Sequence, residues 1–315
     1  MGIDRITCSS LSMAEYFATD GWSDITVAFP VNVLEMETIN KLAAKVKLNL
    51  LVEAPEAVEL ISGKLTSKIN LFIKIDAGYG RTGIENKNLS GIENVIEVIK
   101  KHANLSFTGF LEHAGHSYNA RGKEEIVKVH FETLENMAAL KARYINTFPE
   151  LVISVGDTPT CSVAADFGVA DEIRPGNFVF FDLMQEQIGA CEYEQIAVAM
   201  ACPVVALHPE RNEIVVYGGG VHFSKDRIVT NGNTVFGKAV ENTGAGWGKV
   251  IPDVYLKSLS QEHGIIRATD DFIQKTKIGD IIKVLPVHSC MTADLMDGYM
   301  TTEAEWLQKR VNSLR

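Results

Sequence analysis

The sequence has no apolar run that approaches the roughly 20 residues needed to cross a membrane, so we expect no membrane partner. Basic residues are also scarce, because 30 Lys and Arg stand against 40 Asp and Glu and the net charge is −10 at pH 7. Binding to a phosphate backbone needs clustered Lys and Arg. The sequence therefore argues against nucleic acid as a partner and favours a small metabolite.

Cysteines are few, and the five that occur are irregularly spaced, which argues against a disulfide framework and indicates a reducing compartment. The first residues match neither a signal peptide nor a myristoylation pattern, so we expect a cytoplasmic protein. With 46% hydrophobic and 22% charged residues, the 315-residue chain has an ordinary globular composition and is long enough for one large and one smaller domain.

The first half alternates short β-branched runs with amphipathic helical stretches, which predicts βαβ crossovers and a parallel sheet. We expect strands over residues 5–9, 24–30, 48–53, 69–76, 106–113, 151–155 and 172–181. We expect helices over residues 13–19, 36–45, 57–64, 92–101, 124–144 and 162–167. Seven strands are one short of a closed barrel, so the expected fold class is α/β, a parallel (β/α)8-type barrel lacking its first βα unit.

From about residue 190 the pattern changes to short strands separated by Gly, Pro and Asn turns. Strands are expected over residues 196–207, 213–217, 227–229, 264–268 and 280–287, and only residues 302–315 look helical again. We therefore predict two domains, an α/β barrel over residues 1–188 and a smaller β domain over residues 189–315.

Polar residues gather where four of the expected barrel strands end, which is where parallel α/β barrels carry their chemistry. The segments are 76–83, 112–118, 154–160 and 174–177. The third offers hydroxyls and backbone N–H groups ahead of a helix, an arrangement that suits a phosphate. Each segment also fits ordinary turn chemistry, but four of them at one end of consecutive strands favour a binding site.

Near the end of the chain, His288 and Cys290 are two residues apart. If they lie on a strand they share one face, which suits a soft divalent metal such as zinc. Two ligands do not close a tetrahedral site, so either another ligand comes from elsewhere or the metal keeps positions open for water and substrate. A short pattern of this kind also fits a buried Cys beside a core His.

Five segments occur in a recognisable order: DAGYGRTG at 76–83, GDTPT at 156–160, RPGN at 174–177, GGGVHFSKD at 218–226 and HSC at 288–290. Together they resemble the alanine racemase-type pyridoxal-phosphate fold. Within it they are most similar to the metal-activated D-serine dehydratase and D-threonine aldolase group. The resemblance covers nearly the whole chain and implies pyridoxal 5'-phosphate and zinc, or another divalent metal, as cofactors.

The resemblance also implies roles for single residues. The hydroxyl of Thr158 and the backbone N–H groups of Gly176 and Asn177 would hold the cofactor phosphate, and Tyr118 would contribute from its loop.

Arg81 matches the arginine near the cofactor's phenolic oxygen, and Arg174 takes the position that faces the pyridine nitrogen in alanine racemase. His288 and Cys290 would bind the metal, which would act as a Lewis acid on the β-hydroxyl of the substrate.

One departure from the family pattern concerns the catalytic lysine. Family members form a Schiff base with a lysine on the first barrel strand, and the same lysine removes the α-proton. That strand would precede residue 1, and Lys74 matches a different position. We therefore expect the Schiff-base lysine to be absent from this chain and its turnover to be impaired or lost.

The activity implied by the resemblance is conversion of D-serine to pyruvate and ammonia. Aldolases of the group carry Asp in place of Cys290, so this residue favours the dehydratase. Two alternatives remain, namely aldol cleavage of D-3-hydroxy amino acids and a non-catalytic protein that still binds cofactor and metal. The expected partner is a D-amino acid with a β-hydroxyl. Because members of the family form dimers, the resemblance also implies a homodimer.

Overall fold

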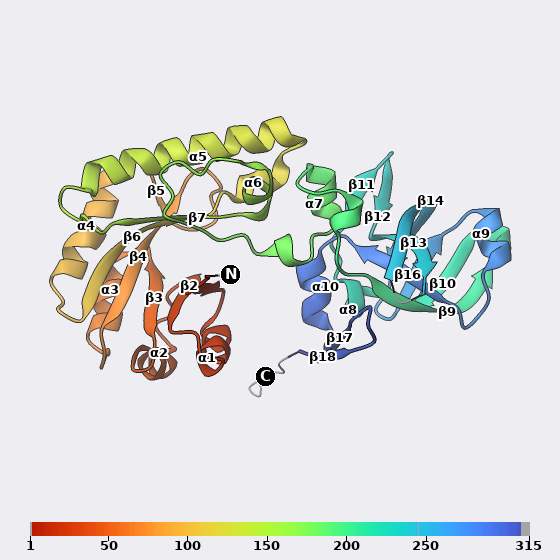
Figure 1. The fold of residues 1–315 in the computed structure, drawn as a ribbon, viewed down its shortest axis with the longest axis horizontal. Coiled ribbons are helices and arrows are strands. Elements are labelled where there is room, and N and C mark those ends of the chain that lie inside the picture. The colour runs from red at the N-terminus through yellow and green to blue at the C-terminus, as the bar shows by residue number, and fades with distance from the viewer. Residues whose placement is uncertain (1, 245, 310–315) are drawn as a thin grey trace. The chain divides into compact units, whose positions relative to one another are not determined.

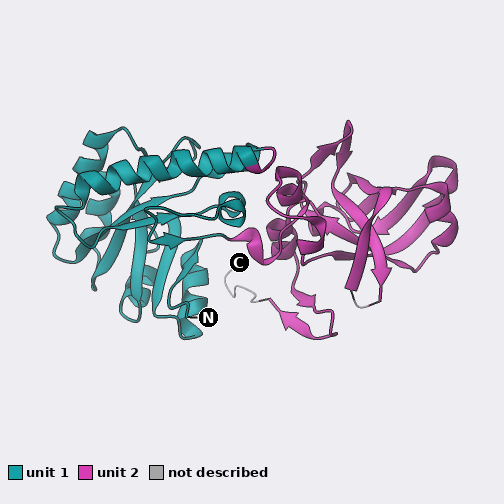
Figure 2. Cartoon of the chain, turned by 45° about the horizontal axis from the view of Figure 1, so that its top comes forward, with its two compact units in different colours: residues 1–120, 124–175 teal, residues 121–123, 176–315 magenta. Residues whose placement is uncertain are grey.

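The computed structural model describes residues 2–244 and 246–309, which fall into two compact units (Figures 1 and 2). Unit 1 contains the residues up to 120 and residues 124–175, whereas unit 2 contains residues 121–123 and those from 176 onward. Each unit has its own hydrophobic core. In the described part of the chain, no helix has the length and apolarity that a membrane span requires.

Unit 1 is built on a parallel sheet in the order β1-β2-β3-β4-β6-β7-β8, with the short β5 paired to β4. This confirms the expected half-barrel of seven parallel strands. The strand bounds are β1 (Ile6–Cys8), β2 (Asp24–Pro30), β3 (Lys47–Val52), β4 (Ile69–Asp76), β5 (Ile84–Glu85), β6 (Leu105–Glu112), β7 (Val152–Val155) and β8 (Glu172–Ile173).

Most of the helices between these strands begin at residues suited to a helix N-terminus. The side chains of Ser10 and Asn88 accept backbone N–H groups at the starts of α1 and α4, and Pro55 opens α3. The helices are α1 (Leu11–Thr19), α2 (Met36–Ala43), α3 (Pro55–Ser62), α4 (Leu89–Lys100), α5 (Lys123–Tyr144) and α6 (Thr158–Val163). The helix expected over 162–167 is wrong in position, because Asp157 caps the chain four residues earlier than expected and helical bonding ends at Ala164.

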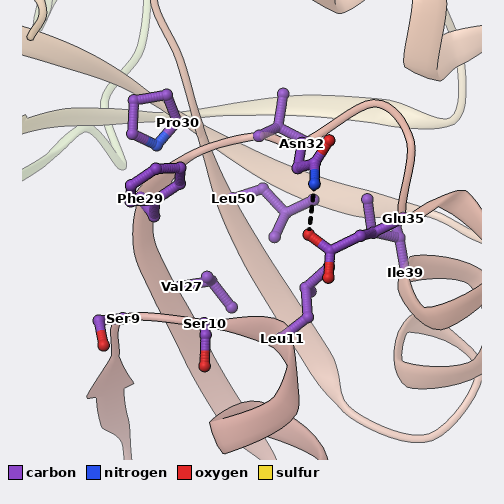
Figure 3. A pocket seen from close by; sticks show the side chains of 11 residues that line it. Ser9, Ser10, Leu11, Val27, Phe29, Pro30, Asn32, Glu35, Ile39 and Leu50 are labelled. Atoms are coloured by element: carbon purple, nitrogen blue, oxygen red, sulfur yellow. Dashed lines mark hydrogen bonds between the residues drawn. The ribbon is translucent and has the colours of Figure 1, made fainter. Parts of the chain in front are cut away.

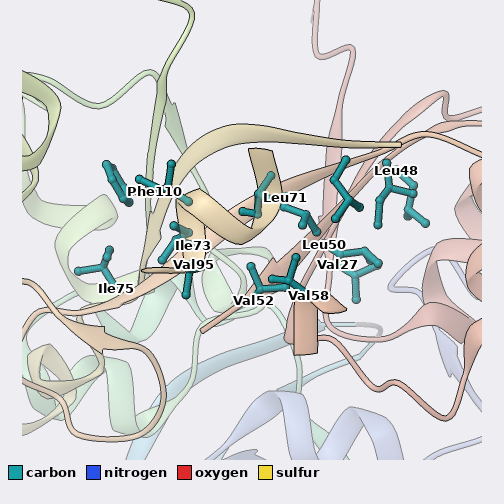
Figure 4. Packing of buried hydrophobic residues seen from close by; sticks show 14 of the residues in the cluster. Val27, Leu48, Leu50, Val52, Val58, Leu71, Ile73, Ile75, Val95 and Phe110 are labelled. Carbon is teal, nitrogen blue, oxygen red and sulfur yellow. The ribbon is translucent and has the colours of Figure 1, made fainter. Parts of the chain in front are cut away.

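The core of unit 1 lies between one face of the sheet and these helices (Figure 4). Leu50 and Val52 on β3, like Leu71 and Ile73 on β4, are two residues apart and therefore lie on the same face. Val58 on α3 belongs to the same buried cluster. The period-two spacing of apolar residues in the sequence thus fixes which face of the sheet the helices cover.

The two ends of the parallel sheet come close without pairing. In the described residues β1 pairs only with β2 and β8 only with β7, while Arg5 Nη1 lies 3.6 Å from Glu172 Oε2. The strand expected over 172–181 is much shorter than predicted. Pro175 has no N–H to donate to a ladder, and the chain enters a 3-10 turn at Asn177–Val179.

Unit 2 is built around a closed antiparallel barrel in the order β10-β15-β14-β13-β16-β9, which confirms the expected smaller β domain. Its strands are β9 (Met200–His208), β10 (Glu213–Tyr217), β13 (Gly237–Thr243), β14 (Gly246–Leu259), β15 (His263–Arg267) and β16 (Ile281–Pro286). Two ribbons are formed by β11 (Ile228–Thr230) with β12 (Asn233–Val235) and by β17 (Gly298–Met300) with β18 (Trp306–Gln308). The helices are α7 (Leu183–Ile188), α8 (Gly220–Phe223), α9 (Asp270–Lys275) and α10 (Ser289–Leu295).

The helix predicted over residues 302–315 is wrong where the structure describes it. The side chain of Thr301 accepts the N–H groups of Glu303 and Glu305, and this turn brings β18 back against β17. Such local bonds from a side chain to the backbone compete with helix formation. Residues 310–315 lie outside the described part.

Candidate functional site

In unit 1, the carboxyl ends of neighbouring strands bring buried charged residues together. Ile75 on β4 is paired with Glu112 on β6, and Arg174 follows directly after β8. The guanidinium of Arg174 donates to Ser154 Oγ at 2.7 Å and to the backbone carbonyl of Glu112. Lys74 donates from Nζ to the carbonyl of Ile75 at 2.6 Å.

Lys74 and Glu112 are buried, whereas Arg174 is half-buried. Glu112 is 1% exposed, and its two carboxylate oxygens have no hydrogen-bond partner in the described part of the chain. Burial raises the pKa of Glu112 against the opposing effect of Lys74, and burial lowers the pKa of Lys74 and of Arg174. Buried acceptors without partners and shifted pKa values are typical of ligand sites.

The loop after β4 is fixed by Asp76, whose Oδ1 accepts the N–H groups of Gly78, Tyr79 and Gly80 at 2.9 to 3.0 Å. Burial alone would raise the pKa of Asp76, but these N–H groups outweigh burial and lower it. Arg81 follows on the same loop, exposed, with its guanidinium carbon 5.3 Å from the centre of the Tyr79 ring. The loop therefore presents a cation at the end of β4.

The loop after β6 places two rings near each other. His113 Nδ1 lies 2.8 Å from the carbonyl of Gly156, so Nδ1 carries the hydrogen and Nε2 keeps its lone pair. Burial lowers the pKa of His113 to about 4, so the ring is neutral at pH 7. The half-buried Tyr118, on the 3-10 turn Gly115–Asn119, has its ring centre 6.3 Å from that of His113.

Thr158 is buried at the start of α6, in a turn that Asp157 holds. The carboxylate of Asp157 accepts the Thr160 N–H at 2.9 Å, the Ser117 hydroxyl at 2.7 Å and the Thr160 hydroxyl at 2.7 Å. The turns that carry Tyr118 and Thr158 are thus linked through one carboxylate.

In unit 2, Gly176 and Asn177 lie at the start of a 3-10 turn. A Cβ added at Gly176 would meet no atom within 4 Å. The Asn177 side chain is buried and donates to Asp182 Oδ2 at 2.7 Å. The Asn177 amide therefore faces the protein interior, and the role predicted for this residue is a role of its backbone.

His288 and Cys290 do not lie on a strand, so the condition under which they would share one face is not met. The strand β16 ends at Pro286, and the Ser289 N–H is taken by Asp182 rather than by a neighbouring strand. His288 is the N-cap of α10, and Cys290 lies in the first turn of that helix. The strand geometry that first paired these two residues on one face does not apply.

The imidazole of His288 nevertheless has the environment of a metal ligand. Its Nδ1 lies 2.9 Å from Asp226 Oδ2, so the carboxylate accepts the Nδ1 hydrogen and leaves the Nε2 lone pair available. The hydroxyl of Ser224 also donates to Asp226 at 3.0 Å. In the described ranges, no three His, Cys, Asp or Glu side chains form a group that could hold a metal. A site built on His288 and Cys290 would therefore keep positions for water or substrate.

The residues that sequence reasoning did not assign are those that support the others, namely Glu112, Asp182 and Asp226. Asp226 ends the GGGVHFSKD segment, so a signal for it was present. Asp182 has no comparable signal, because its partners Asn177 and Ser289 are brought to it only by the fold.

A separate cavity of about 410 Å³ lies beside the carboxyl ends of β1 and β2 (Figure 3). Val27, Ile39 and Leu50 give it an apolar lining, and Asn32 donates to Glu35 at 2.9 Å on its wall. None of the residues predicted for the cofactor or the metal lines this cavity.

Comparison with known proteins agrees with the two-part fold. Residues 1–183 match the family model described as "Alanine racemase, N-terminal domain", and residues 197–302 match that described as "Putative serine dehydratase domain". The D-serine dehydratase of Dictyostelium discoideum is 30% identical, over 93% of this chain and 78% of that protein. A 3-hydroxy-D-aspartate aldolase of Paracoccus denitrificans is 26% identical, over 94% of this chain and 74% of that protein.

Among solved structures, a variant of a D-threo-3-hydroxyaspartate dehydratase in a metal-free form is 25% identical with a TM-score of 0.88. The match covers 98% of this chain and 85% of that one. Taken with the parallel half-barrel, the antiparallel domain and the buried charges at the strand ends, these matches place the chain in the family of pyridoxal-phosphate lyases that contains the D-serine dehydratases and D-threonine aldolases, with an alanine racemase-like fold.

Proposed function

We propose that the protein is of the D-serine dehydratase type, which uses pyridoxal 5'-phosphate and a divalent metal such as zinc to convert D-serine to pyruvate and ammonia. We expect its turnover to be impaired or lost, because none of the 315 residues matches the family's Schiff-base lysine. The observation that carries the proposal is the state of His288, whose Nδ1 is held by Asp226 while Nε2 is left for a metal, two residues before Cys290. The 30% identity to the Dictyostelium discoideum D-serine dehydratase supports the same substrate.

The chemistry supplied by bound pyridoxal phosphate is withdrawal of electrons from the substrate's Cα, and that supplied by bound zinc is Lewis-acid activation of the β-hydroxyl as a leaving group. The residues of this chain would bind the cofactor and the metal and hold them in orientation. Arg174 is held by Ser154 and by the Glu112 carbonyl, and it would face the cofactor's pyridine ring from there. Arg81 is presented by the loop that Asp76 fixes, where it would face the cofactor's phenolic oxygen.

The family resemblance implies phosphate-binding roles for Tyr118 and Thr158 in unit 1 and, separately, for Gly176 and Asn177 in unit 2, and we propose these roles for each unit by itself. Buried Thr158 offers a hydroxyl on a turn fixed by Asp157, and Gly176 offers backbone without a side chain. Both features suit the close approach of a phosphate.

Aldol cleavage of a D-3-hydroxy amino acid is the second candidate activity, favoured by the similarity to the 3-hydroxy-D-aspartate aldolase of Paracoccus denitrificans. The two activities differ in which bond at the substrate's β-carbon breaks. Dehydration breaks the bond to oxygen, whereas aldol cleavage breaks the bond between Cα and Cβ.

The deciding experiment incubates the purified protein with pyridoxal phosphate and zinc, and with D-serine or D-threonine as substrate. A dehydratase releases the 2-oxo acid and ammonia, whereas an aldolase releases glycine and an aldehyde. The expected result is pyruvate from D-serine at an impaired rate, and its loss when a chelator removes the metal. Absence of any product from a protein that binds both cofactor and metal would favour the non-catalytic alternative. Glycine as the main product would replace the proposal with the aldolase.

We also propose a cytoplasmic homodimer. All five cysteines are free thiols in the structure, which suits a reducing compartment. Light scattering on a gel-filtration peak checks the oligomeric state, with twice the monomer mass as the expected result.

A further inference from the structure

A buried network in unit 2 joins the segment predicted to bind phosphate to the segment predicted to bind metal. Its three members are Asn177, Asp182 and Ser289, which are at most 7% exposed. Ser289 lies between His288 and Cys290, and Asn177 follows Gly176. In the sequence, Ser289 is 112 residues from Asn177 and 107 from Asp182, so the fold alone brings them together.

The hydrogen bonds of the network leave little freedom for either segment. Asp182 Oδ2 accepts from Asn177 Nδ2 at 2.7 Å and from the Ser289 N–H at 2.9 Å, and it lies 3.2 Å from the Ser289 hydroxyl. The Ser289 hydroxyl also lies 2.8 Å from Asn177 Oδ1. The other carboxylate oxygen, Asp182 Oδ1, caps α7 by accepting the Gln185 N–H at 2.9 Å.

We propose that Asn177, Asp182 and Ser289 couple cofactor binding to metal binding, so that occupation of the phosphate site tightens the metal site and the reverse. This inference rests on the proposed function. The physical reason is that a phosphate on the backbone at Gly176 and Asn177 restrains the Asn177 side chain, which restrains Ser289 through Asp182. Because His288 and Cys290 flank Ser289, their positions become better defined for a metal. Such coupling is reciprocal by thermodynamic necessity.

Asp182, Asn177 and Ser289 are positioning residues in this proposal. The three side chains bond to one another and not to the cofactor or the metal. Asn177 would affect the phosphate through its own backbone and that of Gly176. Ser289 would affect the metal through its sequence neighbours His288 and Cys290. Loss of the network should therefore lower the coupling factor, which is the ratio of zinc affinities with and without the cofactor. The affinity for each ligand alone should change less.

The test measures zinc affinity by competition with a chelating dye, with and without saturating pyridoxal phosphate. We expect the cofactor to tighten zinc binding about 5-fold or more in the unmodified protein. Pyridoxal, which lacks the phosphate, should leave zinc affinity nearly unchanged. Cofactor affinity measured by fluorescence, with and without zinc, should show the same factor.

Ser289→Ala removes the hydroxyl that joins Asn177 directly to the metal segment but keeps the backbone N–H that donates to Asp182, so we expect it to lower the coupling factor without abolishing it. The matched control is Thr292→Val. It also removes one buried hydroxyl from α10, but the Thr292 hydroxyl donates to the Phe223 carbonyl at 3.3 Å and lies outside the network. The control should keep the coupling.

Asp182→Asn is the second variant, because an amide keeps the oxygen that caps α7 but cannot accept all of the bonds that the carboxylate accepts. Because both the Asn177 amide and the Ser289 N–H donate to the oxygen that this change replaces, Asp182→Asn should abolish the coupling. Coupling that survives in Asp182→Asn, or that is absent from an unmodified protein binding both ligands, overturns this inference alone. Failure of the unmodified protein to bind either ligand overturns the proposed function as well.

Discussion

At the scale of single residues, burial and one hydrogen bond set the chemical state of His113. The carbonyl of Gly156 takes the hydrogen on Nδ1, and burial lowers the pKa of the ring to about 4. The imidazole is therefore a neutral hydrogen-bond acceptor at Nε2 throughout the physiological range. In the unfolded chain the same ring would titrate near 6.5.

This difference makes folding stability depend on pH. Because the folded pKa lies below the unfolded one, the stabilisation by neutral His113 is fully present above about pH 6.5 and is lost as the pH falls toward about 4. The loss should be on the order of 3 kcal/mol. Denaturant unfolding of the protein and of His113→Asn from pH 8 to 4 checks this. The variant should lack that part of the pH dependence, and identical profiles would contradict the assignment.

Asp226 is a second residue whose effect is exerted through a neighbour. Asp226→Ala removes the carboxylate that orients His288, and loss of such a partner lowers metal affinity about 10- to 100-fold in metalloproteins. Equilibrium dialysis with zinc measures the change. Asp271→Ala, which removes an exposed carboxylate on α9 paired only with Lys275 in the described structure, should leave zinc affinity unchanged. Equal zinc affinity in the two variants would show that His288 does not bind the metal.

At the scale of elements, two glycines have opposite surroundings. A Cβ at Gly156 would lie 2.6 Å from the backbone nitrogen of Arg174, so the end of β7 can approach the end of β8 only without a side chain there. A Cβ at Gly176 would meet no atom within 4 Å. The first glycine is needed by the fold, whereas the second is needed only if a ligand approaches the backbone.

Two substitutions separate these needs. Gly156→Ala should lower the free energy of unfolding by about 1–3 kcal/mol through overpacking. Gly176→Ala should leave stability within about 0.5 kcal/mol but weaken pyridoxal phosphate binding, because the methyl group takes space that the phosphate needs. Thermal unfolding and fluorescence titration of both variants measure the two effects. Unchanged cofactor affinity in Gly176→Ala would remove this residue from the phosphate site.

The sequence predicts the elements whose apolar residues repeat with a clear period. Leu50, Val52, Leu71 and Ile73 mark β3 and β4 in this way, and the parallel half-barrel follows from them. By contrast, β14 has only two buried residues, Val254 and Leu256, among its 14 positions, and its pairing with β13 is interrupted by register shifts. Such a strand has no alternation to detect, and its formation depends on pairing partners that only the folded chain supplies.

The residues of the candidate site also fall into those that the local sequence predicts and those that it does not. Arg81, Thr158 and Arg174 belong to local segments whose glycines, prolines and hydroxyls are visible in the sequence, and their strand ends could be predicted. The geometry around His288 could not, because the end of β16 and the start of α10 are fixed by the distant Asp182. Interactions between residues about a hundred positions apart leave no local pattern.

At the scale of the whole molecule, the two units differ in whether their main sheet has an unpaired edge strand. The barrel of unit 2 is closed and has no free edge, whereas β1 in unit 1 has a partner on one side only among the described strands. An unpaired edge is a template for intermolecular pairing. We therefore expect self-association of this 315-residue chain to begin at unit 1.

A lysine on this edge should slow self-association. Thr7 lies in the middle of β1, and Thr7→Lys places a charge where two edges would meet. Light scattering at raised protein concentration should show slower aggregation than in the unmodified chain. The same change at the exposed Thr234 on β12, outside the parallel sheet, should have little effect. Equal aggregation rates for the two variants would place the associating surface elsewhere.

The pairing of β9 with both β10 and β16 also fixes an order of events during synthesis. The barrel of unit 2 stays open until residues 281–286 leave the ribosome, because β16 is the strand that closes it. His288, Ser289 and Cys290 emerge directly afterwards, and only then can Asp182 accept its partner from 107 residues away. A chain arrested before β16 would therefore carry its first sheet but not the assembled segment from His288 to Cys290, so the proposed metal site can form only after β16 has been made.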